Sequence, residues 1–359
     1  MSTKQILVFA GEGSSHSWTW LADLFERHGV VQTQFLDSRS LLDSVGEGES
    51  SIIVSGGDAL AIAREIGPLG FARIETHLSK GGRYVGMCAG AYLPLPSSIE
   101  PLCHFNISST KIENLEFERT DSMAAFPRVF VGYGSCSIVH PVRGKVLLES
   151  INGTIAAPIY GGPIFREPSN ERVLLRYSGF TEKTEFQIDQ DTASRMVLDK
   201  PAAIALEHGS GRLLLLGPHL EHPGYAEANK LFLDLAGITG TAERNRPYHP
   251  NSKNKDFEGA ISDLKVAIRG LENRSFLVGN KLWDGGRYME LLDAVEKRSD
   301  IEDSALATSV TDLLRRMRAQ MLDLPDKYAG YEDASPRLLL EAARLCVNHR
   351  FQRLRGDRK

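Results

Sequence analysis

Residues 81–92 read Gly-Gly-Arg-Tyr-Val-Gly-Met-Cys-Ala-Gly-Ala-Tyr. The pattern predicts a short buried strand up to Met87, a sharp turn at Cys88 and then the start of a helix. The glycines on either side of Cys88 give the cysteine form of a nucleophile elbow, in which small neighbours let strand and helix pack closely. A thiol at a helix N-terminus also feels the positive end of the helix dipole, which lowers its pKa. Cys88 is therefore the candidate nucleophile.

A single cysteine in an apolar run is more often a small core residue. A nucleophile also needs a base, and the base needs a group that orients it. Downstream, the apolar run of residues 212–216 leads into His219, with Glu221 two positions later. In an extended segment this spacing puts both side chains on the same side. We predict a Cys88, His219 and Glu221 triad, and we favour His219 over His222, which directly precedes a proline turn.

The rest of the chain up to residue 238 predicts an α/β fold. Strand and helix patterns alternate up to residue 93, which indicates a doubly wound, mostly parallel sheet. Residues 98–190 instead contain short strand candidates separated by turns, which we interpret as an antiparallel extension. A hairpin over residues 202–216 then delivers His219.

The order of these motifs resembles the class I glutamine amidotransferase-like superfamily. Within it, the sequence is most similar to the N-terminal domain family of biotin-protein ligases, which also occurs as free-standing microbial proteins. The resemblance covers about residues 4–238 and implies a flavodoxin-like sheet. Three motifs carry it: Gly-Gly-x-Tyr-x-Gly-x-Cys-Ala-Gly-x-Tyr at 81–92, Val-Ser-Gly-Gly-Asp at 54–58 and Ile-Tyr-Gly-Gly-Pro at 159–163.

The resemblance also implies residues that bind the substrate. Backbone amides of Gly57, or Gly56, and of Ala89 would hold the oxyanion of a tetrahedral intermediate. A plain strand-to-helix turn capped by Asp58 explains the glycine pair equally well. The loop with Tyr160, Gly161 and Gly162 is expected to approach the pocket, although Gly-Gly-Pro is also a common turn.

One position departs from the superfamily pattern. Glutamine amidotransferases usually carry a glutamine at the place of Tyr92, where it helps to define the glutamine pocket. The phenol argues against glutamine as the donor. We also find no Gly-Arg-Gly-Arg-like biotinyl-binding loop, so we do not predict biotin transfer.

Length and composition limit the remaining possibilities. The chain has 359 residues, which suits an α/β domain over residues 1–238, a linker over 239–254 and a helical region over 255–359. A net charge of -4 argues against a nucleic-acid partner. No apolar run reaches the roughly twenty residues of a membrane span. The N-terminus lacks a signal-peptide pattern, and the four cysteines show no metal-ligand spacing, so we expect a cytoplasmic protein with free thiols, no metal and no cofactor.

Two functions remain open. The first is a cysteine-dependent amidase or amidotransferase-like hydrolase that acts on a small amide or peptide-like substrate. The second is a non-catalytic module in which the same crevice binds a small metabolite. In either case the C-terminal helices could contact a protein partner or a second copy of the chain.

Overall fold

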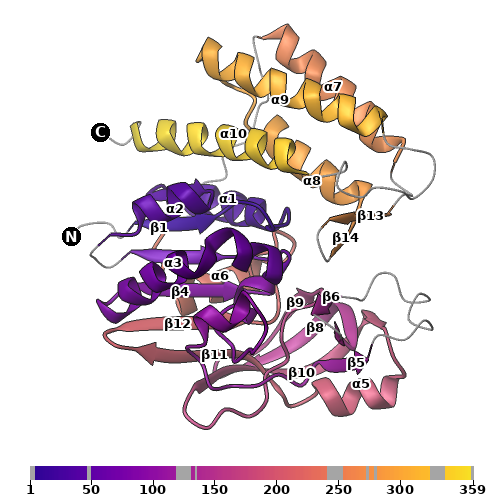
Figure 1. The fold of residues 1–359 in the computed structure, drawn as a ribbon. Helices are drawn as coiled ribbons and strands as arrows, with labels where there is room; N and C mark the ends of the chain where they lie inside the picture. The colour runs from indigo at the N-terminus through magenta and orange to yellow at the C-terminus, as the bar shows by residue number, and fades with distance from the viewer. Residues whose placement is uncertain are drawn as a thin grey trace.

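The computed structural model describes residues 5–46, 50–118, 131–133, 136–240, 254–271, 275–278, 281–323 and 336–356. Its centre is a nine-stranded sheet of order β2-β1-β3-β4-β12-β11-β10-β8-β9. The first five strands in this order run parallel, and the remaining pairings are antiparallel. The predicted parallel sheet with an antiparallel extension is therefore confirmed (Figure 1).

The nine strands divide between a parallel and an antiparallel half. The parallel half contains β1 (Ile6–Phe9), β2 (Thr33–Leu36), β3 (Ser51–Val54), β4 (Arg83–Met87) and β12 (Gly211–Leu216). The antiparallel half contains β8 (Val142–Ser150), β9 (Gly153–Ile159), β10 (Arg172–Phe186) and β11 (Pro201–His208). A separate three-stranded sheet contains β5 (Leu115–Glu118), β6 (Val131–Tyr133) and β7 (Cys136–Val139). Of a strand expected at residues 128–131, residues 128–130 lie outside the described part.

Both faces of the parallel half are buried. Along β1, Ile6 and Val8 join one hydrophobic cluster, whereas Leu7 and Phe9 join another on the opposite face. Such alternation into two cores is typical of a parallel strand covered by helices on both sides. The covering elements of residues 1–238 are α1 (Trp18–Arg27), α2 (Ser38–Ser44), α3 (Ala59–Ser79), α4 (Ala89–Tyr92), η1 (Leu102–Phe105), α5 (Gln190–Val197) and α6 (Ala226–Ala236).

Two short helices and a kink complete this part of the fold. The short helices α2 and α5 were not predicted, although each begins at an aspartate, Asp37 or Asp189, whose side chain accepts a hydrogen bond from a backbone N–H of its first turn. Helix α3 has a kink at Gly67, which has φ 67° and is followed by Pro68.

The C-terminal region was expected to be almost wholly helical, and its described part is helical apart from one hairpin. It contains α7 (Lys255–Arg269), α8 (Gly285–Glu296), α9 (Ser304–Leu322) and α10 (Arg337–Gly356). Between α7 and α8, however, β13 (Ser275–Val278) pairs with β14 (Lys281–Asp284) in an antiparallel hairpin. Most of the predicted linker, residues 241–253, lies outside the described part. Within the described part, no helix has the length and apolar character needed to cross a membrane.

The C-terminal helices pack directly on the α/β part, with α10 beside α1 and α2 (Figure 1). Their buried side chains share one hydrophobic cluster with α1 and the sheet. The side-chain amide of Asn348 on α10 pairs with the backbone of Phe35, accepting from its N–H at 2.9 Å and donating to its C=O at 2.7 Å. Because β2 is an edge strand, this pairing also blocks an exposed edge.

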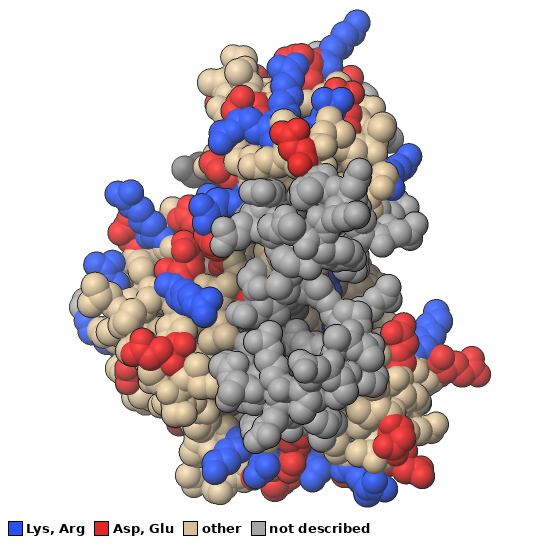
Figure 2. Space-filling view, turned by 45° about the vertical axis from the view of Figure 1, so that its right-hand side comes forward, with Lys and Arg blue, Asp and Glu red and all other residues tan. Residues whose placement is uncertain are grey.

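Charged side chains are mixed over the surface. On the face drawn in Figure 2, the described Lys and Arg side chains are interspersed with Asp and Glu. A nucleic-acid site bound by bulk electrostatics usually gathers positive charge on one face. That the protein has no nucleic-acid partner stays a prediction.

Arg298, which follows α8, fixes the C-terminal helices to α1. Its guanidinium is 2% exposed and lies 2.7 Å from Asp23 and 3.2 Å from Glu26. Burial by itself would raise the pKa of Asp23, but the charges of Arg298 and Lys297 outweigh it and hold that pKa below its usual value. The two parts of the chain are thus joined by a buried ion pair.

We therefore expect Arg298→Met to lower the free energy of unfolding by about 3 kcal/mol, because breaking one side of a buried pair leaves uncompensated charge. Urea denaturation measures the change. Arg316→Met is the matched control, since Arg316 forms an exposed pair with Asp312 within α9, and it should change stability by less than about 0.5 kcal/mol. Equal effects of the two substitutions would contradict the prediction.

Candidate functional site

Cys88 occupies a strained turn between β4 and α4. Its backbone has φ 49° and ψ −108°, a region that residues other than glycine rarely adopt. The turn depends on close backbone packing. A Cβ at Gly90 would lie 2.0 Å from the carbonyl oxygen of Val54, and one at Gly86 would lie 2.4 Å from the carbonyl oxygen of Gly90. These are the features of a nucleophile elbow.

His219 and Glu221 follow the neighbouring strand β12. Cys88 donates its backbone N–H to the carbonyl oxygen of Leu216 at 2.9 Å, so the two segments leave the sheet side by side. His219 Nδ1 and Glu221 Oε1 are 2.7 Å apart. His219 is 3% exposed and Glu221 is fully buried. The structure thus brings Cys88, His219 and Glu221 together at one edge of the sheet.

The charges around His219 favour its protonated form. Burial alone would lower the pKa of His219, but the charges of Glu221 and Cys88 and hydrogen bonds to both side chains outweigh it and raise the pKa to about 10. The ring is then an imidazolium at neutral pH, with its Nδ1–H donated to Glu221. Such a cation beside a thiol favours the thiolate.

Two serine hydroxyls, those of Ser55 and Ser17, are connected by hydrogen bonds to Glu221. Neither serine was predicted as a site residue. Ser55 donates to Glu221 Oε1 at 2.9 Å. The hydroxyl of Ser17 lies 2.9 Å from that of Ser55, and it also accepts the N–H of Gly56 at 2.9 Å. Ser55 lies at the end of β3 within the Val-Ser-Gly-Gly-Asp motif, and this motif could have identified it from the sequence. These bonds hold the carboxylate in place.

The two glycines after β3, Gly56 and Gly57, have different neighbours. A Cβ at Gly56 would lie 2.9 Å from His219 Cε1, so Gly56 borders the imidazole directly. Gly57 instead pairs with Ser14 in an isolated bridge. Asp58 caps α3, since its carboxylate accepts from the N–H groups of the residues two and three positions later at 3.0 and 3.3 Å. The capping role expected of Asp58 is therefore present beside the site.

Ala89 and Tyr92 lie on the elbow helix. Ala89 directly follows Cys88 and is buried. The Tyr92 hydroxyl donates to the carbonyl oxygen of Gly161 at 3.0 Å and accepts from Asn114 Nδ2 at 3.1 Å. Asn114 also donates to the carbonyl oxygen of Gly162 at 3.3 Å. The phenol thus ties the elbow to the Gly-Gly loop.

Aromatic rings line the other side of His219. The ring centroids of Tyr160 and Trp20 lie 5.5 and 5.4 Å from that of His219. His222 packs 4.5 Å from Trp20, and burial followed by the charge of His219 lowers its pKa. Trp20 was not identified from the sequence, because nothing in its local pattern separates it from the core residues of α1.

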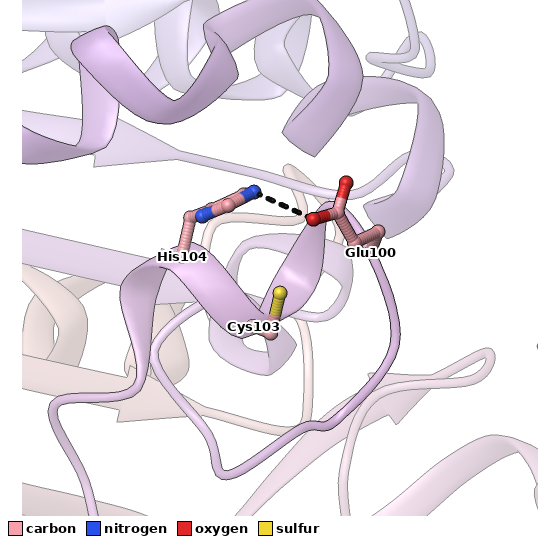
Figure 3. Close-up of side chains that lie close together, drawn as sticks. All are labelled: Glu100, Cys103 and His104. Carbon is pink, nitrogen blue, oxygen red and sulfur yellow. Dashed lines mark ion pairs between the residues drawn. The ribbon is translucent and has the colours of Figure 1, made fainter.

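A second cluster of metal-ligating side chains lies after the elbow helix. Ligand atoms of Glu100, Cys103 and His104 all lie within 4.8 Å of one another, and His104 Nε2 is 3.5 Å from Glu100 Oε1 (Figure 3). The ligand types suit Zn²⁺, with three protein ligands and one open position. Spacings between the cysteines do not reveal this group, because Cys103 is its only cysteine.

Residues 4–132 match the family model described as biotin-protein ligase, N terminal. The chain belongs to this family. An uncharacterized protein of Chlamydia muridarum (strain MoPn / Nigg) is 32% identical over 237 residues, which cover 62% of this chain and 82% of that protein. Residues 4–132, which the family model matches, contain Cys88 and end before His219 and Glu221.

Solved structures resemble the family member at low identity. A Thermoplasma acidophilum protein provisionally described as part of a GMP synthase has a TM-score of 0.39 and 11% identity, over 67% of this chain and 95% of that one. A β-galactosidase from Bacillus circulans sp. alkalophilus has a TM-score of 0.39 and 11% identity, over 68% of this chain and 32% of that one. At these low scores the likenesses say nothing about activity.

The close packing at the elbow predicts an unequal response of two glycines to alanine. Gly90→Ala should lower the free energy of unfolding by about 3 kcal/mol, because its Cβ would overlap a backbone carbonyl. Gly161→Ala should be neutral within about 0.5 kcal/mol, since no heavy atom lies within 4 Å of the added Cβ. Urea denaturation of both variants tests this, and a neutral Gly90→Ala would show that the elbow is not tightly packed.

The raised pKa of His219 predicts a pH-dependent contribution to stability. When the pKa of a histidine is higher in the folded state than its unfolded value of about 6.5, its protonation stabilises the fold. This contribution is complete below about pH 6.5. The stabilisation is lost as the pH rises toward the folded value of about 10. Glu221→Gln should therefore lower the free energy of unfolding by about 3 kcal/mol at pH 6 and by clearly less at pH 10. Urea denaturation at both pH values measures the difference, and a larger loss at pH 10 would refute it.

Proposed function

We propose that the protein is a cysteine-dependent amidase or amidotransferase-like hydrolase that acts on a small amide or peptide-like substrate. The observation that carries the proposal is the position of His219. Its ring bonds to Glu221 at 2.7 Å and also to the side chain of Cys88. A nucleophile, a base and an orienting carboxylate in this order are what acyl transfer requires.

In the proposed mechanism the Cys88 thiolate attacks the amide carbonyl carbon. Backbone N–H groups at Gly56 or Gly57 and at Ala89 stabilise the oxyanion that forms. The C–N bond then breaks as the His219 imidazolium gives its proton to the departing amine. Water attacks the resulting thioester while the neutral imidazole takes a proton from it, which releases the acid and restores the thiolate.

Tyr92 argues against glutamine as the substrate. The phenol occupies the position of the usual glutamine, and its hydroxyl is bound to Gly161 and Asn114. The same observation favours the second candidate function, a non-catalytic module that binds a small metabolite. Cys88 and His219 are each only 3% exposed, which is compatible with such a closed pocket. We still favour the hydrolase, because a pocket that only binds a metabolite does not need a thiol, an imidazole and a carboxylate together.

We further propose a flavodoxin-like, class I glutamine amidotransferase-like domain over residues 1–238, a linker over 239–254 and a C-terminal region over 255–359. The strand order β2-β1-β3-β4-β12 supports the flavodoxin-like assignment. A cytoplasmic location and a protein partner or second copy at the C-terminal helices stay predictions.

The proposal predicts selective alkylation of Cys88. At pH 7 a free cysteine is only a few per cent thiolate, whereas Cys88 paired with an imidazolium should be mostly thiolate. Iodoacetamide should label Cys88 stoichiometrically, and His219→Ala should slow labelling about tenfold, allowing for the lower intrinsic reactivity of a low-pKa thiolate. Peptide mass spectrometry at several times gives the rates.

Cys346 is the internal control, since burial raises its pKa to about 12 and it should stay unlabelled. An unchanged rate in His219→Ala would remove the enzyme proposal. A screen for amide hydrolysis, with Cys88→Ser as the blank, then identifies substrates.

A further inference from the structure

Trp20 links the C-terminal helices to His219. Its indole ring lies edge-on to the imidazole, with centroids 5.4 Å apart and planes at 83°. Its Nε1–H donates to Glu290 Oε2 at 2.7 Å. Glu290 belongs to α8, and its other oxygen lies 3.6 Å from His16 Nε2. A carboxylate from the C-terminal region is therefore held one indole ring away from the candidate base.

Further aromatic rings lie beside Trp20 and His219. The Tyr160 ring lies 6.3 Å from Trp20 and 5.5 Å from His219. Tyr225 packs on His222, which packs on Trp20. Tyr160 is 37% exposed, whereas His219 beside it is buried. Its ring therefore lies where solvent meets the candidate site, and we call Trp20, Tyr160, Tyr225 and Glu290 the aromatic mouth.

The electrostatics of the aromatic mouth favour a positive charge. Burial, followed by the influence of Tyr225, Glu290 and Glu221, raises the pKa of Tyr160 to about 12, while the opposing effect of Arg143 is the smallest of the five. The positive charge that His219 carries when protonated is offset by the carboxylate of Glu221, 2.7 Å from its Nδ1. The opposing positive charges are those of Arg143 at Tyr160 and of Lys297 and Arg287 at Glu290.

We propose that the aromatic mouth binds a cationic group of the substrate, so that the site acts on amides carrying an ammonium group near the scissile bond. Ring faces attract cations through their quadrupole, and the ionised carboxylate of Glu290, held beside the indole of Trp20, adds negative charge. An anionic substrate would instead be repelled by Glu290. This assignment of a substrate class rests on the proposed function of Cys88.

The test compares two thiol reagents of similar size and opposite charge on the full chain. These are the methanethiosulfonates that carry a trimethylammonium-ethyl or a sulfonato-ethyl group. Their second-order rates at Cys88 are followed by peptide mass spectrometry and normalised to the rates with a small free thiol. We expect the cationic reagent to be favoured by about tenfold, as attraction to one charge over several ångströms at a protein surface implies.

Glu290→Gln should reduce this preference about fivefold, and Tyr160→Leu about twofold to fivefold. Glu296→Gln is the matched control, because Glu296 lies on the same helix and pairs with Lys265 instead, and it should leave the preference unchanged. A preference that survives Glu290→Gln, or equal slowing of both reagents, would overturn the assignment.

Failure of this inference can be told apart from failure of the proposed function. Neutral iodoacetamide reports whether His219 activates Cys88, and it does not depend on charge at the aromatic mouth. His219-dependent labelling without charge preference would remove only the cationic substrate. Charge preference without His219-dependent labelling would support a cation-binding pocket and remove the hydrolase.

Discussion

The parallel pairing of β4 with β12 is the constraint on which the site depends. Met87 lies opposite Leu216 in the register, so both strands end at the same level of the sheet. In open α/β sheets, functional groups gather beyond the carboxyl ends of strands. Cys88 and His219 therefore meet although about 130 residues separate them in the chain. A one-residue slip of β12 would turn its side chains to the opposite faces and remove the imidazole from the thiol.

Close backbone packing then sets the distances at this edge. Gly90 lies against β3, and a Cβ at Gly162 would come within 1.9 Å of the carbonyl oxygen of Gly217. The close contact of Gly162 with Gly217 holds the loop that contains Tyr160 against the segment that leads to His219. Side chains at these glycines would separate the layers, because packed interiors have little room for added atoms. The site is thus assembled from backbone surfaces, and the reactive side chains project from them.

The sequence was sufficient for features whose signals are local. Apolar runs predicted the central strands, and the position of His219 and Glu221 after one of them drew attention to the pair. The segment was expected to be extended, but it turns after His219, where the N–H of His222 bonds to the carbonyl oxygen of His219. Ser55 and Trp20 could not be assigned in the same way, because their roles depend on partners far along the chain. Trp20 differs from its neighbour Trp18 by its packing on His219 and by its bond to Glu290, which lies 270 residues later. The β13–β14 hairpin was missed because two four-residue strands are too short to show a clear period.

The C-terminal helices affect the site through more than one route. Arg298 holds them to α1 by a buried ion pair, and Glu290 on α8 binds the α1 residue that packs on His219. Asn348 on α10 closes the edge strand β2. Since the first two contacts are made to α1 itself, a shift of the helices would move Trp20 relative to the imidazole. The position of the aromatic mouth is therefore coupled to the packing of the C-terminal region, so a chain cut after residue 238 would lack Glu290 and part of the core beneath α1.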